Sequence, residues 1–159
     1  MLKLQKRKIR PEQKQNRPGS EKKLAPLADT KPREFEVRGK LSGKVCLITG
    51  GDSGIGKAVS LLFAKEGADL AIAYLSETED ALQTKKEIEE TGQKCILIKG
   101  DLAKEKNCQK VITTTFKKFE QLDIVINNVA LHWESDSIEK ISTEQLMKTF
   151  HANFFSYFW

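Results

Sequence analysis

The chain has 159 residues, of which 39% are hydrophobic and 31% are charged, so it is long enough for one globular domain and too short to expect a second. Its formal net charge of +5 comes from the N-terminal segment: residues 1–40 carry 13 basic and 5 acidic side chains, a net of +8, whereas residues 41–159 carry 14 and 17, a net of −3. No apolar run reaches the length of a membrane-spanning helix and no apolar stretch follows the basic N-terminus, so we expect a cytoplasmic protein without a membrane partner.

Residues 1–40 are predicted to form a basic, extended arm. They show no sustained hydrophobic period and contain all four prolines of the chain, so they cannot bury enough apolar surface to fold alone. This composition is compatible with a solvated tail, an arm along a partner subunit, or a patch for nucleic acid or an anionic membrane. Because the only aromatic residue, Phe35, stands between Glu34 and Glu36, base stacking has little support and we expect no nucleic-acid partner.

Four short apolar runs in the remainder of the chain predict strands, and helical patterns separate them and follow the last one. The runs are 44–50, 68–75, 94–100 and 122–128, and their nearly continuous hydrophobicity is typical of strands covered on both faces. This order predicts an α/β fold, a doubly wound parallel sheet of Rossmann type that stops after the fourth strand and the helix after it. In such sheets, ligands bind beyond the carboxyl ends of the strands.

Cap signals mark the starts of three of these helices. Ser76 with Glu79 predicts a capping box for a helix that runs to about residue 91, and Asp101 is predicted to cap a helix that runs to residue 119. Ser142 with Gln145 predicts the start of a last helix that continues towards the end of the chain.

Cysteine and histidine give no sign of a metal site. Cys46, Cys95 and Cys108 are widely spaced, without a C-x-x-C pair, and the first two lie in apolar runs where a thiol serves as a small core residue. His132 and His151 are isolated from any second ligand. We therefore expect neither a disulfide framework nor a bound metal.

The segment "CLITGGDSGIGKA", residues 46–58, joins the first strand to the first helix by a glycine-rich loop, and one interpretation of this loop is a P-loop. Gly51 to Lys57 matches the spacing G-x-x-x-x-G-K, in which the lysine reaches the outer phosphates of a nucleotide. The next residue, Ala58, has no hydroxyl to hold Mg²⁺, which argues against a nucleotide triphosphatase.

A second interpretation is a dinucleotide-binding loop. Gly50, Gly54 and Gly56 have the spacing G-x-x-x-G-x-G: the first permits a tight turn, the second lets the backbone approach a pyrophosphate, and the third lets the helix pack close to the strand. The amides at the N-terminus of the helix would then meet the anion. Glycines that merely ease a strand-to-helix turn would give the same pattern.

Two further strand ends support the dinucleotide interpretation. Asp101 follows the third strand, where a carboxylate can accept a hydrogen bond from an adenine amino group, and "NNVA" (127–130) ends the fourth. With "TGGDSGIG" (49–56), "GDL" (100–102) and the asparagine of "HANFFSYF" (151–158), residues 41–159 resemble the short-chain dehydrogenase/reductase family, in particular its bacterial general-stress oxidoreductases. The sequence departs from the family's usual NNAG at Val129 and Ala130.

The resemblance implies an NAD(P)-dependent oxidoreductase that acts on a small alcohol or carbonyl compound as a homo-oligomer. We favour NAD over NADP, because Leu75 stands where many NADP-using relatives have arginine, and because Asp52 and the nearby Glu77 would repel a 2′-phosphate. The residues expected to bind the cofactor are Gly50, Asp52, Ser53, Gly54, Ile55, Gly56, Leu75, Asp101, Leu102 and Asn128.

The catalytic set that the resemblance implies, Asn, Ser, Tyr and Lys, is mostly absent. Only Asn153 maps onto it, and neither Tyr74 nor Tyr157 is followed by a lysine four residues later. A tyrosine needs such a partner because its ordinary pKa of about 10 is far from neutral pH. We therefore expect the N-terminal half of the enzyme, inactive alone, with the fourth strand as an apolar edge that lacks its outer neighbour. The alternative is a non-catalytic dinucleotide-binding or assembly module.

Overall fold

The structure, a computed structural model, describes residues 20, 23–30 and 39–159. Most of the predicted arm lies outside these residues. Within the described part, the hydroxyl of Ser20 donates to Asp80 Oδ2 at 3.3 Å, and Thr30 is buried. None of the described helices is long and apolar enough to cross a membrane.

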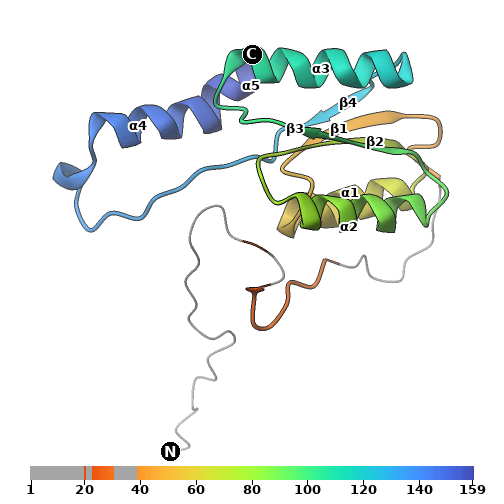
Figure 1. The fold of residues 1–159 in the computed structure, drawn as a ribbon, viewed down its shortest axis with the longest axis horizontal. Helices are drawn as coiled ribbons and strands as arrows, with labels where there is room; N and C mark the ends of the chain where they lie inside the picture. The colour runs from red at the N-terminus through yellow and green to blue at the C-terminus, as the bar shows by residue number, and fades with distance from the viewer. Residues whose placement is uncertain (1–19, 21–22, 31–38) are drawn as a thin grey trace, which may run out of the picture.

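The described residues form a parallel sheet of four strands in the order β3-β2-β1-β4, which confirms the predicted doubly wound fold (Figure 1). The strands are β1 (Val45–Thr49), β2 (Asp69–Tyr74), β3 (Cys95–Lys99) and β4 (Ile124–Ile126). The central strand β1 places Ile48 beside Ile72 of β2 on one side and beside Ile126 of β4 on the other. The strand β4 pairs only with β1, so it is the expected edge, with Val125 43% exposed.

Helices cover both faces of the sheet. Helices α1 (Gly54–Lys65) and α2 (Thr78–Glu89) lie on one face, whereas α3 (Glu105–Phe119) and the short α5 (Ser156–Phe158) lie on the other (Figure 1). After β4 the chain leaves the sheet, and α4 (Thr143–Phe150) lies beyond the carboxyl ends of the strands (Figure 1). The chain then returns to the sheet at α5. This arrangement leaves the carboxyl ends of the strands between the two helical layers.

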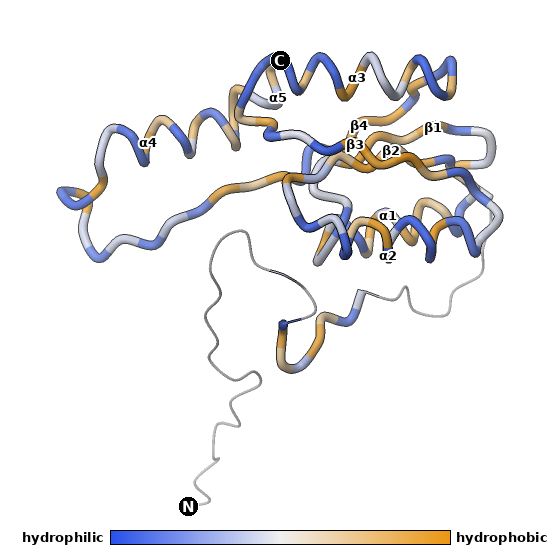
Figure 2. The backbone as a smooth tube through the Cα atoms, viewed as in Figure 1, coloured by the Kyte–Doolittle hydropathy of each residue, from blue (hydrophilic) through white to orange (hydrophobic). Residues whose placement is uncertain are grey.

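The strands are mainly hydrophobic (Figure 2). Because side chains alternate along a strand, they form a core on each face of the sheet. One cluster faces α1 and α2 and includes Cys46, Ile48 and Ile72, and the opposite cluster faces α3 and includes Leu47 and Ala71. Cys46 and Cys95 are buried and free, as expected for core residues, and so is Cys108. Burial raises the pKa of Cys46 to about 11 and that of Cys95 to about 12, so both thiols stay protonated at neutral pH.

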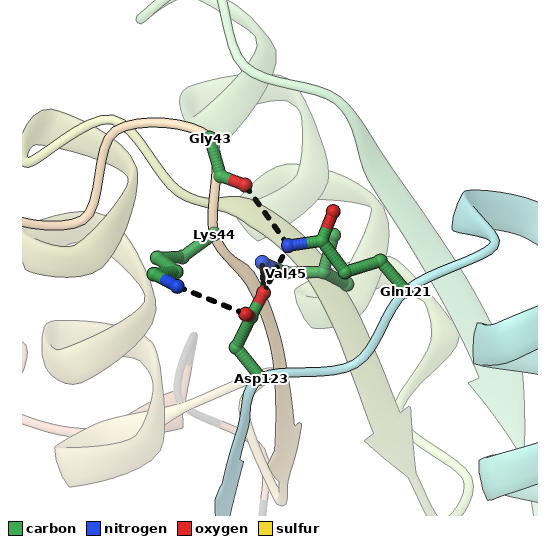
Figure 3. Close-up of polar contacts among 5 residues, drawn as sticks. All are labelled: Gly43, Lys44, Val45, Gln121 and Asp123. Carbon is green, nitrogen blue, oxygen red and sulfur yellow. Dashed lines mark hydrogen bonds and ion pairs between the residues drawn. The ribbon is translucent and has the colours of Figure 1, made fainter.

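An exposed carboxylate joins the start of β4 to the start of β1 (Figure 3). Asp123 Oδ2 accepts from the amide of Val45 at 2.8 Å, and Asp123 Oδ1 accepts from Lys44 Nζ at 3.1 Å. The side-chain amide of Gln121 donates both to Asp123 Oδ2 and to the carbonyl of Gly43. The Val45 amide first, and then Lys44, hold the pKa of Asp123 below its ordinary value, so the carboxylate stays ionised to a lower pH than an ordinary aspartate.

Two predicted helix caps were wrong, and one is confirmed. Helix α2 begins at Thr78, because the amide and hydroxyl of Thr78 both donate to the carbonyl of Ser76, which stays outside the helix. Helix α3 begins at Glu105, because Asp101 Oδ1 accepts from the amide of Ala103 in a turn that precedes the helix. Ser142 caps α4 as predicted: its hydroxyl accepts from the amide of Gln145 at 3.1 Å.

The predicted last helix is interrupted. Between α4 and α5, residues His151–Phe155 form a π-helical turn. Such turns are rare and frequently lie at functional sites. Asn153 lies at the centre of this one.

Candidate functional site

A cleft of about 220 Å³ opens at the carboxyl ends of the first three strands. Its floor and walls come from four loops: the glycine loop after β1, the segments after β2 and β3, and the segment after β4. This is the position at which doubly wound sheets bind ligands. The described residues that line it are Gly50, Asp52, Ser53, Ala73, Tyr74, Leu75, Ser76, Glu77, Gly100, Asp101, Leu102, Ala103, Val129, Ala130, Leu131 and Ala152.

The glycine loop has the close packing that the dinucleotide interpretation predicts. Gly50 has φ +63°, in the left-handed region that glycine adopts at little cost. A Cβ atom at Gly56 would stand 1.9 Å from the Gly50 carbonyl oxygen and 2.6 Å from Asn128 Nδ2, so only glycine lets α1 approach the strand end this closely. A Cβ atom at Gly54 would meet nothing within 4 Å, which leaves the backbone open to a ligand.

Lys57 does not take the role that a P-loop gives its lysine. The side chain is buried and directed towards α2, where Nζ lies 3.0 Å from Glu87 Oε1. Lys57 is not among the residues that line the cleft. The contact with Glu87 therefore removes the main support for a P-loop, in agreement with the missing hydroxyl at Ala58.

Two polar side chains fix the segment after β4 against the glycine loop. Asn128 Nδ2 donates to the carbonyls of Thr49 and Gly50, both at 3.0 Å. The hydroxyl of Thr49 accepts from the amides of Asn128 and Val129, each at 3.0 Å. Asn128 therefore lies behind the loop as a support and does not line the cleft.

Asn153 and Tyr157 hold the far wall of the cleft. Asn153 Oδ1 accepts from the amide of Leu131 at 2.7 Å, and Asn153 Nδ2 donates to the carbonyl of the same residue at 2.8 Å. The hydroxyl of Tyr157 donates to the carbonyl of Val129 at 2.9 Å. The π-helical turn thus places Asn153 so that both atoms of its side-chain amide bind one residue of the loop.

The cleft is acidic. Asp52, Glu77 and Asp101 line it, and no Lys or Arg is among the described lining residues. Lys104 Nζ lies 3.9 Å from Asp101 Oδ2 on an exposed surface. Leu75 is 49% exposed at the end of β2, where it borders the same cleft.

The structure brings six of the ten predicted cofactor residues to the cleft. Gly54, Ile55, Gly56 and Asn128 are not among the lining residues, and Ile55 is 77% exposed. The residues that the sequence did not point to are mostly apolar lining residues, such as Ala152, together with the buried Thr84, whose hydroxyl donates to the Asp52 carbonyl. The fold brings these residues to the cleft, and no sequence motif predicts their position. No group of three metal-ligating side chains occurs among the residues described.

Several known proteins with similar sequences are named as oxidoreductases. The family model described as short chain dehydrogenase matches residues 44–159. The uncharacterized oxidoreductase YhdF of Bacillus subtilis (strain 168) is 48% identical over 148 residues, which are 93% of this chain and 51% of the relative. General stress protein 39 of the same organism is 47% identical over 150 residues, 94% of this chain and 52% of the relative.

Solved structures give the same result for the fold. A short chain dehydrogenase from Burkholderia cenocepacia J2315, in complex with NADP, is 31% identical with a TM-score of 0.71, and the match covers 74% of this chain and 47% of that one. This chain thus spans about half the length of the curated relatives and of the solved structure that it matches.

Proposed function

The chain belongs to the short-chain dehydrogenase family, and on this premise we propose that it forms the dinucleotide-binding half of an NAD-dependent oxidoreductase that acts on a small alcohol or carbonyl compound. The observation that carries the proposal is the contact of Gly56 with Gly50 and Asn128, which brings the N-terminus of α1 to the edge of a cleft at the carboxyl ends of the strands. When bound, the nicotinamide accepts or donates the hydride. The similarity to named oxidoreductases favours this function over a module without catalysis.

The glycine loop would hold the pyrophosphate. Ser53 and the first residues of α1, Gly54, Ile55 and Gly56, lie at the positive end of the helix dipole. Gly50 contributes its tight turn, because its own amide donates to the carbonyl of Ala73 at 2.7 Å. The open space at Gly54 fits a ligand that approaches the backbone. Asn128 supports the loop from behind, and its role in binding is therefore indirect.

The acidic lining of the cleft supports NAD as the cofactor, with NADP as the alternative. A ribose hydroxyl can donate a hydrogen bond to a carboxylate, whereas the 2′-phosphate of NADP requires a basic partner. Asp52, Leu75 and Glu77 all border the cleft. None of the described lining residues is a lysine or arginine that could bind a phosphate. Asp101 and Leu102, after β3, would then contact the adenine.

We propose that Asn153 positions the wall of the site and that this chain has no turnover alone. Both side-chain atoms of Asn153 bind the backbone of Leu131, which lines the cleft. The two tyrosine hydroxyls have other roles: Tyr74 lies 3.5 Å from Thr78 Oγ1, and Tyr157 donates to Val129. Neither is arranged with a lysine as an acid/base pair.

A homo-oligomer is the partner we propose. Phe154 and Phe158, on the last helical segments, are 61% and 85% exposed, and apolar surface of this kind commonly marks a protein interface.

The test is calorimetric titration of the chain with NAD and with NADP, followed by a hydride-transfer assay over a panel of alcohols and carbonyl compounds. We expect NAD to bind at least tenfold more tightly than NADP, a difference of about 1.4 kcal/mol, and we expect no turnover. Tighter binding of NADP would contradict the cofactor assignment alone, and binding of neither dinucleotide would contradict the proposed function.

A further inference from the structure

Helix α2 reaches the glycine loop through one buried hydroxyl. Thr84 is fully buried, and its Oγ1 donates to the carbonyl of Asp52 at 2.8 Å. The two residues are 32 positions apart in sequence, and Asp52 is itself buried in the lining of the cleft. A side chain outside the loop therefore fixes the direction of a peptide group within it.

The fixed carbonyl determines where the next amide points. The peptide group between Asp52 and Ser53 is planar and trans, so its N–H points opposite to its C=O. With the carbonyl held towards Thr84, the amide of Ser53 is directed to the other side of the loop. Within the described part of the chain this amide has no hydrogen-bond acceptor, although Ser53 lines the cleft.

A second contact between the same two elements holds the start of α1. Glu87 lies one turn beyond Thr84 on α2 and accepts from Lys57 Nζ at 3.0 Å, and Gln83 Nε2 donates to the same Glu87 oxygen at 2.9 Å. The Lys57 side chain is 10% exposed and that of Glu87 24%, so the pair is shielded from solvent. The first turn of α1 is thus tied to α2 close to the point where Thr84 binds the loop.

We propose that Thr84 is a positioning residue for the cofactor: by holding the Asp52 carbonyl, it directs the Ser53 amide towards the pyrophosphate of the dinucleotide. This inference rests on the proposed function. A donor that is already oriented binds an anion without the cost of ordering the loop. The loss of the Thr84 hydroxyl should therefore weaken binding of a pyrophosphate more than binding of an adenine ring.

The experiment compares Thr84→Val, which keeps the shape and removes the hydroxyl, with Thr84→Ser, which restores it. Dissociation constants are measured by NMR titration of the full chain with ADP, which has a pyrophosphate, and with adenosine, which has none. We expect Thr84→Val to weaken ADP binding about fivefold and to leave adenosine binding unchanged. Thr84→Ser should restore ADP binding to within about twofold of the wild type.

A matched control is Thr115→Val. Thr115 is also fully buried, but its hydroxyl donates to Val111 inside α3, far from the loop. This variant should lose stability without a change in the ratio of the ADP and adenosine constants. If Thr84→Val does not fold, Thr84→Ala removes the same hydroxyl with less bulk, and the same ratio is measured.

The outcomes separate the inference from the function on which it rests. Unchanged ADP binding in the hydroxyl-free variants, or equal weakening of ADP and adenosine, would overturn the positioning role while the proposed function stands. If the wild type bound neither ADP nor NAD, the proposed function would fail, and the inference with it.

Discussion

Replacement of Gly56 by alanine should destabilise the chain more than any other single added methyl group in the glycine loop. The new Cβ atom would stand 1.9 Å from the Gly50 carbonyl oxygen, and an ordinary contact begins at 3.4 Å. The start of α1 would therefore have to move by about 1.5 Å away from the strand end. The added methyl group would also crowd Asn128 Nδ2, at 2.6 Å, and so weaken the hydrogen bonds that this atom donates at 3.0 Å to the carbonyls of Thr49 and Gly50.

The expected cost is about 2–6 kcal/mol, from about 1–3 kcal/mol of overpacking and about 0.5–1.5 kcal/mol for each of the two weakened hydrogen bonds. This is a large part of the roughly 5–15 kcal/mol by which domains of this size are stable. The measurement is urea denaturation followed by circular dichroism, with Gly54→Ala as the control. A Cβ atom at Gly54 meets nothing within 4 Å, so its positive φ of 52° should cost only about 1–2 kcal/mol.

The stability lost in Gly56→Ala, compared with that lost in Gly54→Ala, tests the close approach of α1 to the strand end. If Gly56→Ala kept the urea midpoint of the wild type, or lost less stability than Gly54→Ala, the close approach of α1 to β1 and Asn128 would be wrong. The dinucleotide function would then lose its main structural support.

Three further predictions concern charge, specificity and surface. The pKa of Asp123 is lowered in the folded state, so its contribution to stability is present above the ordinary carboxyl pKa and is lost as the pH falls through the folded value. Asp123→Asn should therefore flatten the acid limb of a stability–pH profile measured by thermal melts. Leu75→Arg should raise NADP affinity relative to NAD, and an unchanged ratio in calorimetry would remove the case for NAD. Phe154→Ser with Phe158→Ser should reduce self-association in light scattering without restoring turnover.

The sequence was sufficient for the sheet because each strand is a nearly continuous apolar run, and the two central strands, β1 and β2, are buried on both faces. Ile48, for example, packs into the cluster against α1 and α2, whereas its neighbour Leu47 faces α3. The glycine spacing likewise predicted the tight contact at Gly56, because only one residue type tolerates it. Apolar runs and glycine spacing both reflect local chemistry, so a sequence pattern can predict their structural consequences.

The wrong caps have local causes, whereas the interrupted last helix depends on a distant contact. Ser76 has the sequence of a cap, but Thr78 uses the Ser76 carbonyl and begins the helix two residues later. The π-helical turn at Asn153 accompanies hydrogen bonds to Leu131, 22 residues away. Thr84 and Asp52 are 32 residues apart in sequence, so no local motif around either residue predicts their contact.

The most direct test of the dinucleotide site is an NMR titration of the isotope-labelled chain with NAD. Our account predicts the largest chemical-shift changes at the amides of the glycine loop, Ser53 and Gly54 foremost, with further changes at Glu77 and Asp101 along the cleft. Shifts confined to another surface, such as the cavity between β4, α3 and α5, or no shifts at saturating NAD, would contradict it.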